Sequence, residues 1–277
     1  YSLTSNASSD TLKAEGLLDN YTSTFKPGAG GAVGLGAFQE IKGKPEAVLV
    51  TGIAMTGGLY SNKSPLNLLA STPVAKVLRE YDAIVVPANS KYRTLKQLMD
   101  DLVAKPNSVA IAGGSKGGID HQVIGLLAQK ASIDPTKLNY VVFSGGPEVI
   151  TSVLSGSTQV GISGSSEFNA FVSSGKLRVL GVSSSKALPG FKGKTFVSQG
   201  YDLVYGNWRG IMAPADLPKA DYLNLIKVID IMHVSPSWQA QLKKNNWDNE
   251  FAAGTAFKAF LEKHIPEINT VMKGLGI

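Results

Sequence analysis

Short apolar runs alternate with segments of helical periodicity through the middle of the chain. The runs have the length and composition of buried strands, and the segments between them place apolar residues on one face. Strands that alternate with helices predict βαβ units and a parallel sheet, and therefore an α/β fold. The predicted strands are 81–86, 109–112, 139–143, 159–163 and 178–183.

The ends of the chain are patterned differently. Residues 21–25 alternate like a strand, and residues 66–78 have helical spacing that is punctuated by Pro73. Beyond residue 185 the pattern is mostly helical, which suggests that the C-terminal part packs on another lobe. Its predicted helices are 220–232, 236–244 and 255–272.

Turns rich in glycine and serine open three of the predicted helices, at 113–118, 144–146 and 164–166, and the glycine-rich turn at 28–31 is a fourth. Loops at the carboxyl ends of parallel strands gather on one edge of a sheet, where ligands bind. The first amides of a helix have no partner within it and carry a partial positive charge, so they bind anions. One such turn alone is more simply a capped strand-to-helix connection. The repetition favours an anion-binding site.

Composition narrows the functional classes. The net charge is +6, but Lys243-Lys244 is the longest basic run, which argues against nucleic-acid binding and favours attraction of a small anion. The absence of cysteine excludes thiolate chemistry, and three dispersed histidines argue against zinc, so no metal or cofactor is expected. No apolar run approaches the roughly 18 residues of a membrane span. No signal peptide is visible, which predicts a cytoplasmic or already processed chain.

Residues 113–117 also match G-x-S-x-G, the strand-to-helix turn that carries a nucleophilic serine in hydrolases. A triad would need a later histidine to activate Ser115. His233 lies near a helix end, His264 lies on a surface helix, and His121 is only one helical turn away. A serine hydrolase that uses Ser115 is therefore the alternative from another functional class.

Arg209 stands between Trp208 and Gly210 in a short segment near a predicted strand. A guanidinium group binds a carboxylate through two parallel hydrogen bonds, so Arg209 is a candidate carboxylate clamp. A structural ion pair beside a buried tryptophan is the other reading of the same segment.

Several segments together resemble the extracytoplasmic solute-binding subunits of tripartite tricarboxylate transporters, the TctC/Bug family. They follow the family's order over roughly residues 15–275, and each is weak alone but specific in combination. The segments are Lys-Pro-Gly-Ala-Gly-Gly at 26–31, Ala-Val-Leu-Val-Thr-Gly at 47–52, Gly-Gly-Ser-Lys-Gly-Gly-Ile-Asp-His at 113–121, Asn-Tyr-Val-Val-Phe-Ser-Gly-Gly at 139–146, Gly-Ile-Ser-Gly-Ser-Ser-Glu at 161–167, Ser-Gly-Lys-Leu-Arg at 174–178 and Gly-Asn-Trp-Arg-Gly at 206–210.

The resemblance implies a type II periplasmic-binding-protein fold, with two α/β lobes joined by two crossover segments and a ligand closed between them. Crossovers near Val86-Pro87 and Asn207 would give one lobe of residues 1–86 plus 208–277 and another of 87–207. The implied protein is a periplasmic, non-enzymatic monomer. It would capture a small di- or tricarboxylate, with a citrate-like acid expected first, and deliver it to the membrane permease. A sensing module without transport is the third reading.

In the family, loop amides, hydroxyls and ordered waters hold the carboxylates of the ligand. Carried onto this chain, Thr51 and His121 would flank the site and Arg209 would add a cation. The expected ligand-binding residues are Gly28, Ala29, Gly30, Gly31, Thr51, Ser115, Gly117, Gly118, His121, Ser144, Gly145, Gly146, Ser165 and Arg209.

Two departures from the family pattern stand out. Members begin with a strand and a Pro/Gly-rich ligand loop that ends in Asp, and residues 1–10 show no such unit. Gln159 occupies the position before the Gly-Ile-Ser strand where Asp is common. The first departure leaves one wall of the predicted site unassigned.

Overall fold

The computed structural model describes the whole chain, Tyr1–Ile277, and divides it into two compact units. Unit 1 consists of Tyr1–Arg79 and Trp208–Asn269, and unit 2 of Glu80–Asn207 and Thr270–Ile277. The first division falls inside a continuous strand, so no linker marks it. The two ligand-closing lobes predicted from the sequence, residues 1–86 plus 208–277 and residues 87–207, stay a prediction.

The sheet of unit 1 is antiparallel where its register is defined. Strand β1 (Leu49–Gly52) pairs with β7 (Gly206–Ala213), which places Thr51 opposite Gly210, and the short β8 (Ala252–Ala253) pairs with β2 (Thr72–Pro87). Strand β7 lies between β1 and β2. The helical elements are α1 (Ser2–Ala14), η1 (Ala29–Gly31), α2 (Ala32–Gln39), α3 (Ile53–Ser61), η2 (Leu68–Ala70), α8 (Lys219–Val234), α9 (Pro236–Asn245) and α10 (Thr255–Gly274), whose last residues belong to unit 2.

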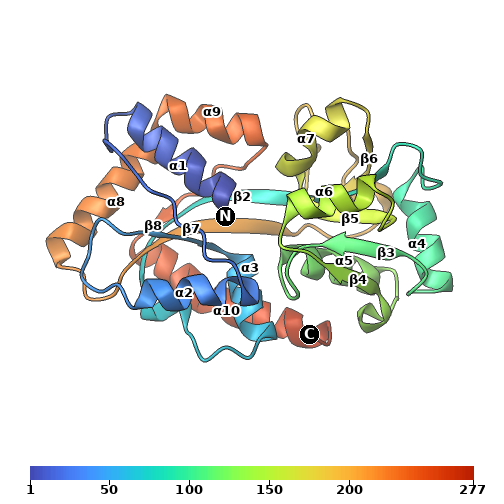
Figure 1. Cartoon of the computed structure of the whole chain (residues 1–277), viewed down its shortest axis with the longest axis horizontal. Coiled ribbons are helices and arrows are strands. Elements are labelled where there is room, and N and C mark those ends of the chain that lie inside the picture. The colour runs from blue at the N-terminus through green and yellow to red at the C-terminus, as the bar shows by residue number, and fades with distance from the viewer. The chain divides into compact units, whose positions relative to one another are not determined.

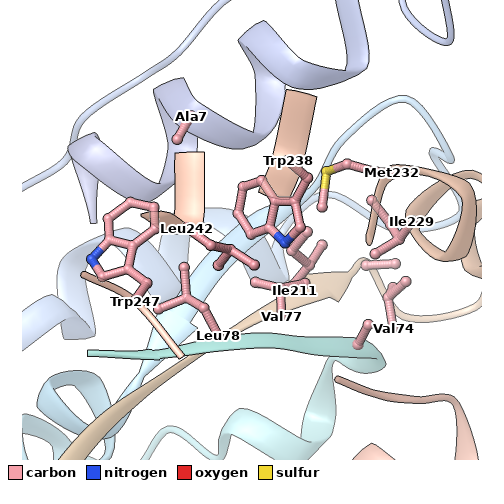
Figure 2. Close-up of a cluster of buried hydrophobic side chains, with 12 residues drawn as sticks. Ala7, Val74, Val77, Leu78, Ile211, Ile229, Met232, Trp238, Leu242 and Trp247 are labelled. Atoms are coloured by element: carbon pink, nitrogen blue, oxygen red, sulfur yellow. The ribbon is translucent and has the colours of Figure 1, made fainter. Parts of the chain in front are cut away.

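Two tryptophans dominate the core of unit 1. Trp238 of α9 is fully buried, and its ring centroid lies 6.3 Å from that of Trp247. Figure 2 shows Ala7 of α1 and Met232 of α8 on one side of this cluster, with Val74 and Leu78 of β2 on the other. Helices α1, α8 and α9 therefore cover one face of β2 and β7 in unit 1 (Figure 2).

The first fourteen residues are helical rather than extended. Helix α1 packs against α9 and α8, and Figure 1 shows it beside α9. Residues 21–25, which alternate like a strand in the sequence, form none, and Tyr21 and Phe25 are exposed. Residues 66–78 form η2 and the start of β2 instead of a helix. These two local predictions are wrong.

Unit 2 contains a mixed sheet. Strand β3 (Ala110–Gly113) runs parallel to both β4 (Asn139–Val142) and β5 (Val160–Gly164), as predicted. Strand β2, which enters from unit 1, runs antiparallel to β5 and β6 (Leu177–Val182), so the prediction of a wholly parallel sheet is wrong. The helical elements are α4 (Leu95–Ala104), α5 (Ile119–Lys130), η3 (Pro135–Lys137), α6 (Gly146–Leu154), α7 (Ser165–Ser173) and η4 (Val197–Gln199).

The helices of unit 2 begin where the sequence predicts. Thr94 caps α4 in a capping box with Gln97, and Pro147 stands in the first turn of α6. Helices α6 and α7 lie together on one side of β5 (Figure 1). Strands β3 and β4 lead through short turns into α5 and α6. Strand β5 runs directly into α7, so the turn predicted at 164–166 is instead the end of the strand and the first residues of the helix. No helix of the chain combines the length and apolarity that crossing a bilayer demands.

Candidate functional site

The turn between β3 and α5 is fixed by Tyr140 of the neighbouring strand β4. Tyr140 Oη donates to the carbonyl oxygen of Gly114 at 2.9 Å. A Cβ at Gly113 would lie 2.7 Å from Tyr140 Cζ, closer than real Cβ atoms come, so only glycine fits beneath the ring. The glycine pair that interrupts the apolar run in the sequence is thus required by packing as well as by the turn.

His121, on the first turn of α5, folds back onto the same turn. The Gly117 amide donates to its Nδ1 at 3.2 Å, and its ring stacks on Tyr140 with centroids 4.1 Å apart and planes inclined by 7°. Burial, and then the charge of Lys116, lowers the pKa of His121 to about 4. The imidazole is therefore neutral at neutral pH.

Gln122 attaches the turn to the segment before β7. Its Nε2 donates to the Gly117 carbonyl at 2.8 Å, and its Oε1 accepts from Tyr205 Oη at 2.6 Å. Gln122 is fully buried, so its polar groups need these partners. The turn is held from three sides, by α5, β4 and the chain preceding β7.

Asp120 binds the start of the turn, because the Gly114 amide donates to its Oδ2 at 2.7 Å. Burial raises the pKa of Asp120 to about 6, although the Gly114 hydrogen bond opposes the shift. The charges of Glu167 and Glu80 raise the pKa further, and Asp82 lies within hydrogen-bonding reach. The Asp120 carboxyl group therefore lies at the N-terminal end of α5.

The other two turns of unit 2 also carry acidic residues. The Ser144 amide donates to Glu148 Oε2 at 3.0 Å, and Ser163 Oγ donates to Glu167 Oε2 at 2.5 Å. A side chain at Gly146 would collide with the carboxylate of Glu167, so glycine is needed there. The carboxylates of α6 and α7 thus help to order the turns from which those helices start.

These contacts separate the predicted donors of unit 2 into two groups. The amides of Gly117, Gly118 and Ser144 already donate, to His121, the Ser115 carbonyl and Glu148 respectively. By contrast, the amide and hydroxyl of Ser115, the amide of Gly145 and the hydroxyl of Ser165 make no hydrogen bond within the unit. The latter groups are the candidate donors to an anion, and among them Ser165 is almost fully buried.

In unit 1 the predicted turn lies at the start of α2. All four of its residues have positive φ, between +46° at Ala29 and +130° at Gly28. Gly30 packs against Gly58 of α3, where an added Cβ would lie 2.5 Å from the Gly58 Cα. The close approach of two backbones requires glycine in this turn, beside Gly31 and the N-terminal end of α2.

Thr51 and Arg209 come together through the pairing of β1 with β7, where Gly52 lies opposite Arg209. Thr51 is fully buried, and its Oγ1 donates to Met55 Sδ at 3.4 Å. The guanidinium of Arg209 lies over the Tyr1 ring at 4.6 Å. The neighbouring Trp208 is a core residue, packed edge-on against aromatic rings of α10.

Ser115 has no activating base within unit 2. His121 uses Nδ1 to accept the Gly117 amide, and the Ser115 hydroxyl makes no hydrogen bond there. In unit 1, His264 pairs with Glu267 at 2.9 Å and His233 stacks on Phe251. No group of acidic and histidine side chains is arranged to hold a metal ion.

Sequence reasoning missed Asp120, Tyr140, Gln122 and Glu167 as residues that build the site. Asp120 and Glu167 carry one usable signal, since an acidic residue in the first turn of a helix stabilises the exposed amides. Tyr140 and Gln122 carry none, because their roles depend on strand pairing and on Tyr205, which is distant in the sequence.

Comparison with known proteins assigns the chain to a family. Residues 12–277 match the TctC model, described as the tripartite tricarboxylate transporter family receptor. A curated relative from Pseudomonas sp. strain P51, the UPF0065 protein in the tcbD-tcbE intergenic region, is 21% identical over 219 residues. The match covers 76% of this chain, and the chain spans 62% of the length of that relative.

Solved structures share the fold at low identity. The periplasmic binding protein BugD superposes with a TM-score of 0.87 at 18% identity, covering 99% of this chain and 93% of its own. Rhodopseudomonas palustris Rpa4515 with adipate has a TM-score of 0.85 at 15% identity, with coverage of 99% and 92%. MatC from the same organism, with bound malate, has a TM-score of 0.81 at 15% identity, with coverage of 98% and 93%.

These matches confirm the predicted type II periplasmic-binding-protein fold class. The family match also makes the serine hydrolase alternative wrong, because the family consists of transport receptors. The chain belongs to the tripartite tricarboxylate transporter family of receptors, TctC, whose members are solute-binding proteins and not enzymes.

Proposed function

We propose that this chain binds a small di- or tricarboxylate in the periplasm and delivers it to the membrane permease of a tripartite tricarboxylate transporter. The observation that carries the proposal is the family match over residues 12–277. Two relatives of the same fold are named with dicarboxylates, malate and adipate, which supports the ligand class. A citrate-like acid is the tricarboxylate to test first, and a monomer is the proposed working form.

The available donors of unit 2 suit a carboxylate. Ser115 offers an amide and a hydroxyl in the turn that precedes α5, Gly145 offers an amide at the N-cap of α6, and Ser165 offers a hydroxyl at the first residue of α7. Aligned peptide dipoles make such positions favourable for negative charge. The net charge of +6 favours the approach of an anion over longer distances.

The other predicted contacts of unit 2 would not donate hydrogen bonds to the ligand. The amides of Gly117, Gly118 and Ser144 already donate within the chain, so these residues support the proposal by shaping the turns. Gly146 has the same role through its fit against Glu167. Gly28–Gly31, Thr51 and Arg209 of unit 1 stay predicted ligand contacts.

A thermal-shift screen of the purified chain tests the proposal. A ligand at about 100 times its dissociation constant stabilises the folded state by roughly 2.7 kcal/mol, which raises the melting temperature by several degrees. We expect such a rise with at least one of malate, adipate and citrate. Acetate at the same ionic strength is the control for nonspecific anion effects.

The Ser115→Ala variant links any shift to the site. It loses one hydroxyl donor to a charged group, worth about 1.5–3 kcal/mol, so the same acid should bind more weakly by roughly 10- to 100-fold. A flat response of the native chain to all three acids would contradict the proposed ligand class. An unchanged affinity of the variant would contradict the role of Ser115.

A further inference from the structure

We propose that His121 holds a carboxylate group of the bound solute through Nε2–H, as a neutral imidazole whose orientation is fixed by Gly117 and Tyr140. The inference rests on the proposed function, because it assigns a specificity-determining role within the same site. It differs from the usual expectation that a histidine attracts an anion through positive charge.

The tautomer follows from the hydrogen bond at the other nitrogen. The Gly117 amide donates to His121 Nδ1 at 3.2 Å, so Nδ1 acts as the acceptor and the single proton of the neutral ring is on Nε2. The two nitrogens of an imidazole point in different directions. The Nε2–H therefore points away from Gly117 and is not used by this contact.

The ring orientation is fixed by Tyr140. The two rings are nearly parallel with centroids 4.1 Å apart, and Tyr140 Oη is itself attached to the Gly114 carbonyl at 2.9 Å. Parallel pairing of β3 with β4 places Tyr140 opposite Ile111, two residues before the turn. Both supports of His121 are thus anchored to the turn that carries Ser115.

In this arrangement the N–H group offered to the solute is His121 Nε2–H of a side chain and not the backbone amide of Gly117. The Gly117 amide would itself be free to donate to an anion if it did not donate its hydrogen bond to His121. Instead, the partly buried imidazole accepts the Gly117 amide at Nδ1 and keeps Nε2–H as a donor of its own, in a turn that also carries the amide and hydroxyl of Ser115. Two donors of Ser115 and one of His121 would then serve one carboxylate.

Burial, more than charge, keeps the imidazole neutral. Burial, and then the charge of Lys116 in the turn, lowers the pKa of His121 to about 4. Asp120 on α5 and Tyr140 on β4 are the other titratable neighbours, and Glu80, Asp82 and Glu167 surround Asp120. A neutral ring with Nδ1 occupied can only donate, so the solute group beside it must be an acceptor and not an ammonium group.

Nuclear magnetic resonance of the ¹⁵N-histidine-labelled full chain tests the tautomer directly. Only three histidines are present, and His121→Phe identifies the signals of His121. We expect a neutral ring protonated at Nε2 that does not titrate between pH 5.5 and 8. A titration near the ordinary histidine pKa of about 6.5, or a proton on Nδ1, would overturn the proposal.

Calorimetric titration with malate, adipate and citrate at pH 8 tests the contact. His121→Phe keeps an aromatic ring for stacking on Tyr140 but has no N–H, and we expect it to weaken the binding of the preferred acid by about 10- to 100-fold. His121→Gln retains an N–H donor and should recover part of the loss. His264→Phe, in α10, is the matched control and should bind as the native chain does.

The outcomes separate the two claims. Equal affinities of the native chain and His121→Phe for an acid that binds would overturn the role of His121 and leave the proposed function intact. Failure of all three acids to bind the native chain would overturn the proposed function, and with it the role of His121, whatever the tautomer.

Discussion

Asp120 makes the stability of the ligand-free chain depend on pH in an unusual direction. Its folded-state pKa of about 6 exceeds the ordinary 3.8, so the folded chain binds the proton more tightly than the unfolded chain does. For a carboxyl group with a raised pKa, the favourable effect is present at low pH. Stability falls as pH rises from about 4 through 6, where the buried group ionises.

The shift sets the magnitude. A difference of 2.2 units between 6 and 3.8, at about 1.4 kcal/mol per unit, corresponds to a cost of about 3 kcal/mol at pH 7.5. Asp120→Asn removes the charge while Asn Oδ1 still accepts the Gly114 amide. We expect the variant to be more stable than the native chain at pH 7.5, by up to about 3 kcal/mol, and the difference to shrink to about 1 kcal/mol at pH 4.5.

Urea unfolding followed by circular dichroism at the two pH values measures this difference. Asp202→Asn is the control, since the Asp202 side chain is 98% exposed and its replacement should change stability little at either pH. A stability difference between Asp120→Asn and the native chain that is the same at both pH values would refute the reasoning. So would a variant that is less stable at pH 7.5.

Three further substitutions test the packing around the site and the two units. Trp238→Ala should lower the unfolding free energy by about 3–5 kcal/mol in chemical denaturation, because the indole is fully buried; a loss below 1 kcal/mol would contradict its central place. Gly113→Ala should cost about 1–3 kcal/mol in the same assay by displacing Tyr140, whereas Gly36→Ala, which meets only ordinary contacts in α2, should cost nothing. Thr94→Ala removes the capping box of α4 and should lower the melting temperature by the equivalent of about 1 kcal/mol, and an unchanged value would show that the box is dispensable.

The strands and helices in the middle of the chain could be predicted from the sequence because the signals that define them are local. An apolar run that breaks at Gly113-Gly114 and continues as a helical pattern fixes a strand, a turn and a helix within twenty residues. The cap at Thr94 and the proline in the first turn of α6 are equally local. The direction of β2 relative to its neighbours was not predictable in this way, because β2 pairs with β5 and β6, which are distant in the sequence.

The errors lie where tertiary contacts override local pattern. Residues 21–25 alternate apolar and polar side chains as a strand does, but they pair with no neighbouring strand and form none. Residues 72–78 have spacing compatible with a helix, yet they pair in β2, where β8 and β7 satisfy their backbone groups. Pro73 at the beginning of that strand is permitted there and excluded from a helix interior.

The candidate site was predictable as a set of turns but not as a set of donors. Glycine and serine at 113–118 and 144–146 mark the turns that we propose as ligand contacts. Which amides are used depends on His121, Asp120 and Glu148 folding back from the helices that follow. Those side-chain contacts use the amides of Gly117 and Ser144 and leave Ser115, Gly145 and Ser165 as the proposed donors.

Isothermal titration calorimetry of the native chain with malate, adipate and citrate at pH 7.5 decides whether this protein binds small carboxylates. We expect saturable binding of at least one of these acids at one molecule per chain, with weaker binding by the Ser115→Ala variant. The absence of saturable heat for all three acids, with a chain shown by circular dichroism to be folded, would contradict it.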